Sequence, residues 1–90
     1  MAKKIAVLVR DRQAEALRTA LGLTMDDDEV HVYILDCRLD NNDQRLAENI
    51  AMLSELGTRI VSTCPDLPFE LMQNEAVARE LVHYDTVIPF

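Results

Sequence analysis

The stretch TRIVSTCP at residues 58–65 decides the fold that this 90-residue sequence predicts. It is a short run rich in β-branched residues, which is typical of a strand, and Pro65 ends it. In a parallel sheet, the residue that follows a central strand lies at the edge where such sheets bind ligands. The stretch therefore predicts a central strand at Arg59–Thr63 that delivers the thiol of Cys64 to that edge.

Three further strands are expected around this one. Residues 3–10 contain the continuous apolar run Ile5–Val9, which is typical of a strand covered on both faces. Residues 29–35 have one apolar face and one mixed face, which predicts an edge strand. Residues 85–90 contain Pro89, which cannot donate a ladder hydrogen bond, so this strand is also expected at an edge.

Three helical patterns alternate with these strands. We expect Asp11 to cap the first helix and Gly22 to stop it. The second helix is expected to start at Asn41 and to close at Gly57, and the third to be capped by Asn74. Because each connection between strands carries a helix, the sheet is expected to be parallel.

The fold class predicted is α/β, as one domain over residues 1–90. It is a small doubly wound four-stranded parallel sheet, in the order 2-1-3-4, with helices on both faces. This order places the apolar first and third strands in the centre. Residues 65–73 contain two prolines and predict an irregular connection. Two open sheet edges on a small domain favour a homo-oligomer.

The composition excludes several classes of protein. The net charge is −7, from 16 acidic and 9 basic residues, which argues against binding to nucleic acid or to an anionic membrane surface. No apolar run is long enough for a membrane span or a signal sequence. No glycine-rich phosphate loop or histidine pair is present, so no cofactor and no metal site are expected. Two cysteines do not make a secreted disulfide framework, which predicts a cytoplasmic location.

The chemistry is expected where the strand order reverses, between the first and third strands at the carboxyl edge of the sheet. Three arginines and a thiol, delivered by three strands, converge there, and helix N-termini add positive dipole ends that attract anions. The residues expected to meet at this edge are Arg10, Asp11, Arg12, Cys37, Arg38 and Cys64.

Each of these residues has a functional and a structural interpretation. Cys64 is either a reactive thiol, with its pKa lowered by a nearby cation, or a small buried apolar residue. Cys37 is expected to be structural. The order 2-1-3-4 puts another strand between the two cysteines, which argues against a disulfide. Arg12 either helps to hold an anion or pairs locally with Asp11 or Glu15.

A spaced pattern of residues marks the last third of the chain. It reads Phe69-x-Leu71, then Ala76-x-Ala78, then Asp85-x-Val87-x-x-Phe90. Together with Cys64 directly after the third strand, this pattern resembles the DsrE/DsrF-like family of small sulfur-relay proteins, which includes the TusBCD subunits. The resemblance implies a parallel α/β sandwich, an oligomer, and sulfane sulfur carried as a persulfide on Cys64 between donor and acceptor proteins.

Three functions stay open at this point. The first is a sulfur-relay protein of the sulfurtransferase type that uses Cys64. The second is a non-catalytic oligomeric binding or assembly module of the same fold. The third is a small-anion binder that uses Arg10, Arg12 and the helix N-termini without the thiol.

Overall fold

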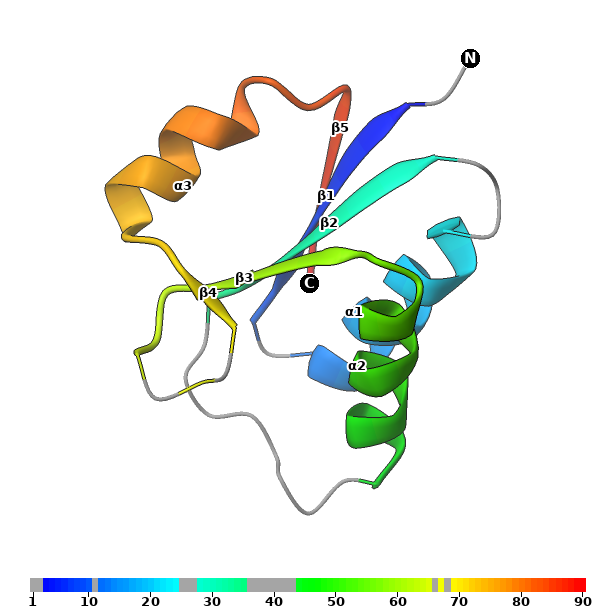
Figure 1. The fold of residues 1–90 in the computed structure, drawn as a ribbon. Coiled ribbons are helices and arrows are strands. Elements are labelled where there is room, and N and C mark those ends of the chain that lie inside the picture. Colours follow the sequence, from blue (N-terminus) through cyan, green and yellow to red (C-terminus); the bar gives the residue numbers. More distant parts are fainter. Residues whose placement is uncertain (1–2, 11, 25–27, 36–43, 66, 68) are drawn as a thin grey trace.

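The computed structural model describes residues 3–10, 12–24, 28–35, 44–65, 67 and 69–90. Within these residues, five strands form one parallel sheet and three helices pack on it (Figure 1). The strands are β1 (Lys4–Val9), β2 (Glu29–Ile34), β3 (Arg59–Ser62), β4 (Glu70–Leu71) and β5 (Thr86–Pro89). The helices are α1 (Gln13–Thr24), α2 (Gln44–Glu55) and α3 (Asn74–Leu81). The α/β class and the parallel sheet agree with the sequence prediction.

The strand order is β4-β3-β2-β1-β5, so the predicted order 2-1-3-4 is wrong. The second strand, β2, lies in the centre between β1 and β3 and is not an edge strand. Its mixed face misled the prediction, because Tyr33 on that face is 0% exposed and its hydroxyl donates a hydrogen bond to Glu80. The polar atoms on this face of β2 are therefore hydrogen-bonded within the protein, and they do not indicate that the face is exposed to solvent.

The sheet has five strands and not the four predicted, because β4 forms inside the segment expected to be irregular. It has only two residues, which pair with Val61 and Ser62 of β3. The backbone N–H of Met72 then donates to the carbonyl oxygen of Ser62 at 2.9 Å. Two residues are too few to show an alternating pattern, so no periodicity in the sequence predicts this strand.

The glycine expected to end the first helix does not do so. Gly22 lies inside α1, which runs on to Thr24, where the hydroxyl donates to the carbonyl oxygen of Leu21 at 2.6 Å. The third helix begins at Asn74, and Gln73 occupies the N-cap position in its place. The predicted cap at Asp11 and the predicted start at Asn41 lie outside the described residues.

The closure of α2 at Gly57 is confirmed. Gly57 has φ +78°, a backbone conformation that residues with a Cβ atom rarely adopt. Its N–H donates to the carbonyl of Ser54, and the N–H of Thr58 donates to the carbonyl of Leu53. This pair of bonds is a Schellman motif, which satisfies carbonyls at the end of the helix and turns the chain into β3.

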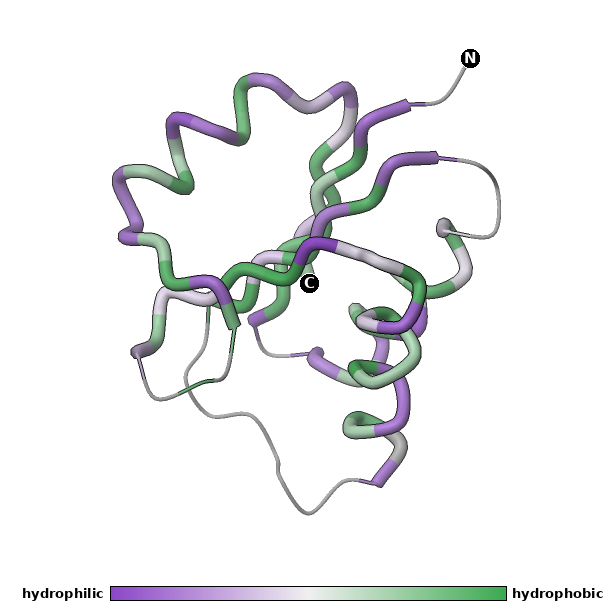
Figure 2. Tube along the Cα trace, viewed as in Figure 1, coloured by the Kyte–Doolittle hydropathy of each residue, from purple (hydrophilic) through white to green (hydrophobic). Residues whose placement is uncertain are grey.

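The helices cover both faces of the sheet, as Figure 1 shows: α1 and α2 lie on one face and α3 lies on the other. The larger core cluster joins α1 and α2 to the sheet and includes Val7, Leu17, Val32 and Leu53, all 0% exposed. The smaller cluster lies under α3, which contributes one buried residue, Val77. Figure 2 shows α3 alternating between hydrophobic and hydrophilic residues, as expected of a helix with one face on a sheet.

Both edge strands are short. The strand β5 pairs only with β1, which confirms the edge position predicted from Pro89. Leu71 on β4 and Val87 on β5 are 57% and 38% exposed, so each edge carries an accessible apolar side chain. Among the described residues, none of the helices combines the length and the hydropathy that crossing a membrane requires.

Candidate functional site

The residues predicted to form one site are separated by the observed strand order. The order reverses between β1 and β5, whereas Cys64 follows β3. Since β2 lies between β1 and β3, the carboxyl ends of these two strands are about 10 Å apart. The predicted convergence of Cys64 with Arg10 and Arg12 at one crevice therefore depended on a strand order that does not occur.

Cys64 is enclosed by protein. It is 2% exposed, its backbone N–H donates to Ser62 Oγ at 2.9 Å, and its sulfur is disulfide-bonded. The expectation of unpaired cysteines was wrong because it placed another strand between β2 and β3, which are neighbours. Cys37, the other cysteine of the chain, lies outside the described residues, as do Asp11 and Arg38.

The two arginines after β1 lie on the surface. Arg10 is exposed, and Arg12 forms an exposed ion pair with Glu15 at 3.5 Å, one of the two local pairs expected from the sequence. The guanidinium carbon of Arg12 also lies 5.7 Å from the ring centroid of Phe90. These contacts place Arg12 at the reversal between β1 and β5.

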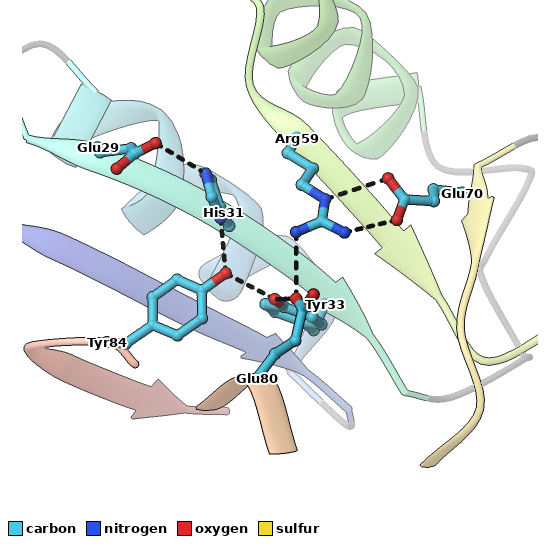
Figure 3. Close-up of polar contacts among 7 residues, drawn as sticks. All are labelled: Glu29, His31, Tyr33, Arg59, Glu70, Glu80 and Tyr84. Carbon is cyan, nitrogen blue, oxygen red and sulfur yellow. Dashed lines mark hydrogen bonds and ion pairs between the residues drawn. The ribbon is translucent and has the colours of Figure 1, made fainter. Parts of the chain in front are cut away.

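A second set of polar residues, apart from the predicted site, lies on the face of the sheet that α3 covers. Residues from three neighbouring strands, from α3 and from the turn that follows α3 join in one chain of polar contacts (Figure 3). The members of this polar network are Glu29, His31, Tyr33, Arg59, Glu70, Glu80 and Tyr84. The register explains part of it, because His31 and Tyr33 share a face of β2 and Arg59 lies directly opposite His31.

Arg59 joins two elements at the outer end of this network. Its guanidinium donates to both carboxylate oxygens of Glu70, at 3.1 and 2.5 Å, and to Glu80 Oε2 at 3.1 Å. The hydrogen bonds from Arg59 hold the pKa of the Glu70 carboxyl below its usual range, and the hydrogen bond from Tyr33 does the same for the pKa of Glu80. Both carboxylates are therefore ionised acceptors near neutral pH.

The two tyrosines of the chain lie at the centre of the network. The Tyr33 hydroxyl donates to Glu80 Oε2 at 2.7 Å and lies 2.6 Å from the Tyr84 hydroxyl, and the two rings meet edge to face. Burial raises the pKa of both phenols, so both stay protonated near neutral pH. Lys4 Nζ lies 4.8 Å from the centroid of the Tyr84 ring and places a cation on this side of the network.

His31 connects Tyr84 to Glu29 at the other end of the network. Its Nδ1 lies 2.6 Å from the Tyr84 hydroxyl and its Nε2 lies 3.3 Å from Glu29 Oε1. Burial lowers the pKa of His31, and Lys4 and Arg59 lower it further, while Glu29 opposes them. The pKa of His31 is lowered overall, although Glu29 favours the imidazolium. Glu29 is 62% exposed, so water screens its attraction.

A cavity of about 270 Å³ borders this network at the amino ends of β2 and β3. His31, Arg59 and Glu29 belong to its lining, together with Asp28, whose carboxylate accepts a hydrogen bond from the backbone of Lys3. The arrangement offers a small polar ligand a titratable imidazole beside two carboxylates. No group of three or more metal-ligating side chains stands together in the described ranges.

The sequence analysis looked only for a pair of histidines and missed the network around His31. The available signal was the spacing of His31 and Tyr33, two aromatic polar residues on one face of an otherwise apolar strand. The partners on α3 and after it, Glu80 and Tyr84, are about fifty residues away in the chain and only the fold brings them near.

Comparisons of the chain with protein-family models, with curated proteins and with solved structures found no match in any of the three.

Proposed function

We propose that this chain is a non-catalytic binding or assembly module. The observation that carries the proposal is the enclosed state of Cys64, which is 2% exposed and disulfide-bonded. A thiol acts as a nucleophile only as an accessible thiolate, so this state leaves the cysteine a packing and cross-linking role.

Assembly is supported by the open edge of β5. The strand Thr86–Pro89 contains no charged residue, in a chain whose residues are 28% charged. Val87 on this strand is 38% exposed, and Val82, at the end of α3, is 78% exposed. Natural edge strands are commonly protected by charged side chains, by proline or by short length. The strand β5 is short and ends in Pro89 but lacks charge, so we infer pairing with a second copy of the chain along Thr86, Val87 and Ile88.

We expect Val87→Lys to weaken self-association at least about tenfold, because it puts a charge on the pairing edge. Sedimentation velocity over a concentration series measures the association constant directly. The matched control is Leu56→Lys, which changes a 56% exposed leucine in the turn that follows α2 and leaves the β5 edge intact.

Two results would contradict the assembly proposal. One is a wild-type protein that stays monomeric throughout the concentration series. The other is an equal loss of association in Val87→Lys and Leu56→Lys, which would indicate a general effect of added charge.

A sulfur relay at Cys64 is the second candidate. It is favoured by the position of Cys64 directly after β3, at the carboxyl edge of the sheet, where the family resemblance puts the sulfur-carrying cysteine. The reaction begins with reduction of the disulfide by a dithiol. The Cys64 thiolate then attacks the sulfane sulfur of a donor persulfide, the donor leaves as a thiolate, and an acceptor thiolate later takes the outer sulfur from Cys64.

We expect reduced protein incubated with a sulfane-sulfur donor to gain the mass of one sulfur atom on Cys64 if it is a relay protein. Intact and peptide mass spectrometry locate the adduct, and Cys64→Ser is the control. An adduct that forms equally on urea-denatured protein, or none on the reduced folded protein, removes the relay and leaves the assembly proposal standing.

A further inference from the structure

The cavity of about 270 Å³ at the amino ends of β2 and β3 is separate from the edge proposed for self-association, because β1 lies between β2 and β5. Two helices end at this cavity. Thr24 is the last residue of α1, and Leu56 and Gly57 follow the end of α2. A helix carries a partial negative charge at its carboxyl end, so both helices favour a cation here.

The acidic side chains that line the cavity add to this preference. Asp28 and Glu29 both belong to the lining, and the backbone N–H of Lys3 donates to one oxygen of Asp28 at 3.0 Å. A carboxylate can accept about four hydrogen bonds, so this bond leaves Asp28 with room for further donors. Both carboxylates can therefore attract a positively charged ligand.

Arg59 also lines the cavity, but its guanidinium is held by carboxylates outside the lining. Its Nε and Nη2 donate to Glu70, and its Nη1 donates to Glu80. Two carboxylates thus balance its one positive charge, and an anion in the cavity would have to compete with both. Lys4 lies over the ring of Tyr84 and is not part of the lining. The cavity therefore favours a cation over an anion.

Counting hydrogens in the network shows which nitrogen of His31 is an acceptor. Each tyrosine hydroxyl has one hydrogen, and Tyr33 donates its hydrogen to the ionised Glu80. The hydroxyl oxygens of Tyr33 and Tyr84 lie 2.6 Å apart and need a hydrogen between them, so Tyr84 donates to Tyr33. The Tyr84 oxygen then accepts from His31 Nδ1–H, which leaves a lone pair on Nε2 of neutral His31.

This lone pair lies beside a carboxylate at the cavity. Nε2 of His31 is 3.3 Å from Glu29 Oε1, as Figure 3 shows, and both residues belong to the lining. Histidine has an ordinary pKa of about 6.5, so His31 is neutral in mildly alkaline solution and no hydrogen joins these two acceptors. A positively charged donor with at least two hydrogens would satisfy both acceptors at once.

We propose that the cavity binds a small primary alkylammonium ion, whose –NH₃⁺ group donates one hydrogen to His31 Nε2 and another to the Glu29 carboxylate. Asp28 and the two helix ends add negative charge around this group. The apolar residues Val30 and Leu56 in the lining suit a short alkyl chain. The volume of about 270 Å³ lies just below the range of about 300–1,000 Å³ that is usual for ligand pockets, so the ligand is small.

NMR titration of the full chain with butylammonium chloride tests this site. At about pH 8 the ion is protonated, as the lysine amine is with its pKa of about 10.4, while His31 is neutral. We expect saturable shifts in the amide resonances of Glu29, His31 and Thr58, with a dissociation constant of roughly 1–10 mM, as suits so small a ligand. The ¹⁵N resonance of His31 Nε2 should shift in the direction of a nitrogen that accepts a hydrogen bond.

Glu29→Gln should weaken the binding of butylammonium at least about tenfold, because the ion loses a charged acceptor. The side chain of Glu29 is mostly exposed, so the fold should tolerate the change. The matched control is Glu75→Gln, which makes the same change of charge at an exposed position on α3 and should leave binding as in the wild type. At equal ionic strength, 1-butanol and butyrate should give no saturable shift at the cavity.

Four results would each overturn the site. They are no saturable shift with butylammonium, equal binding of 1-butanol or butyrate, unchanged binding in Glu29→Gln, and an equal loss in Glu75→Gln. The spectrum of His31 in the wild type is a further test that needs no variant. A hydrogen on Nε2 at about pH 8 would contradict the tautomer and with it the proposed acceptor.

Discussion

Replacing Leu53 by alanine is expected to lower the free energy of unfolding by about 2–5 kcal/mol. Leu53 is 0% exposed and packs between α2 and the sheet in the larger core cluster. The substitution removes three buried carbon atoms and leaves a cavity that the close-packed surroundings fill only in part. A domain of this length has a total stability of roughly 5–13 kcal/mol, so the loss is a large share of it.

Urea denaturation followed by circular dichroism measures this loss, with an unchanged m-value as the sign that the unfolded state is the same. The matched control is Met52→Ala, one residue earlier on the same helix, where the side chain is 48% exposed. It should cost less than about 0.5 kcal/mol. Similar losses for the two variants would mean that α2 does not pack on the sheet through Leu53.

Replacing Tyr33 by phenylalanine is expected to cost about 1–3 kcal/mol, although it removes a single oxygen atom. The ring is fully buried and its packing is kept. The loss comes from the polar network, because Glu80 loses a donor and the Tyr84 hydroxyl loses the acceptor that its hydrogen uses. Chemical denaturation near neutral pH, where the carboxylates of Glu70 and Glu80 are ionised, measures the effect.

A double-mutant cycle with Tyr84→Phe separates the network from the individual bonds. If the two hydroxyls act as one ordered chain, the coupling between the substitutions should be about 0.5–1.5 kcal/mol. Additive losses would show that Tyr33 and Tyr84 contribute independently.

Local patterns predicted the elements of this fold well. The apolar run of β1, the positive φ at Gly57 and the proline of β5 each depend on residues that are near one another in the chain, so the sequence shows them directly. The two-residue β4 and the continuation of α1 past Gly22 are different, because tertiary pairing and packing outweigh weak local preferences there.

The order of the strands could not be read in the same way. The prediction assumed that a strand with polar residues on one face lies at an edge, and β2 shows why this fails. His31 and Tyr33 are polar at their tips and apolar along their rings, so a helix that supplies partners for the tips can cover them. Nothing in the sequence near Tyr84 or Glu80 indicates that these two residues pair with β2.

The error in the strand order also put the expected site in the wrong place. With β2 in the centre, Cys64 and the arginines after β1 no longer share a crevice, and β2 and β3 become neighbours. The candidate site shifts from the thiol to the network of His31, the two tyrosines and Arg59, whose members lie on several different elements.

Two residues near the ends of the described chain, Lys4 and Asp85, are joined by a reciprocal pair of hydrogen bonds. The backbone N–H of Lys4 donates to Asp85 Oδ2, and the backbone N–H of Asp85 donates to the carbonyl oxygen of Lys4, each at 2.8 Å. Because these residues are 81 positions apart, the pairing of β5 with β1 closes almost the whole polypeptide into one loop. Such distant pairing carries a high entropic cost before any contact is gained, so we expect β5 to pair with β1 late in folding.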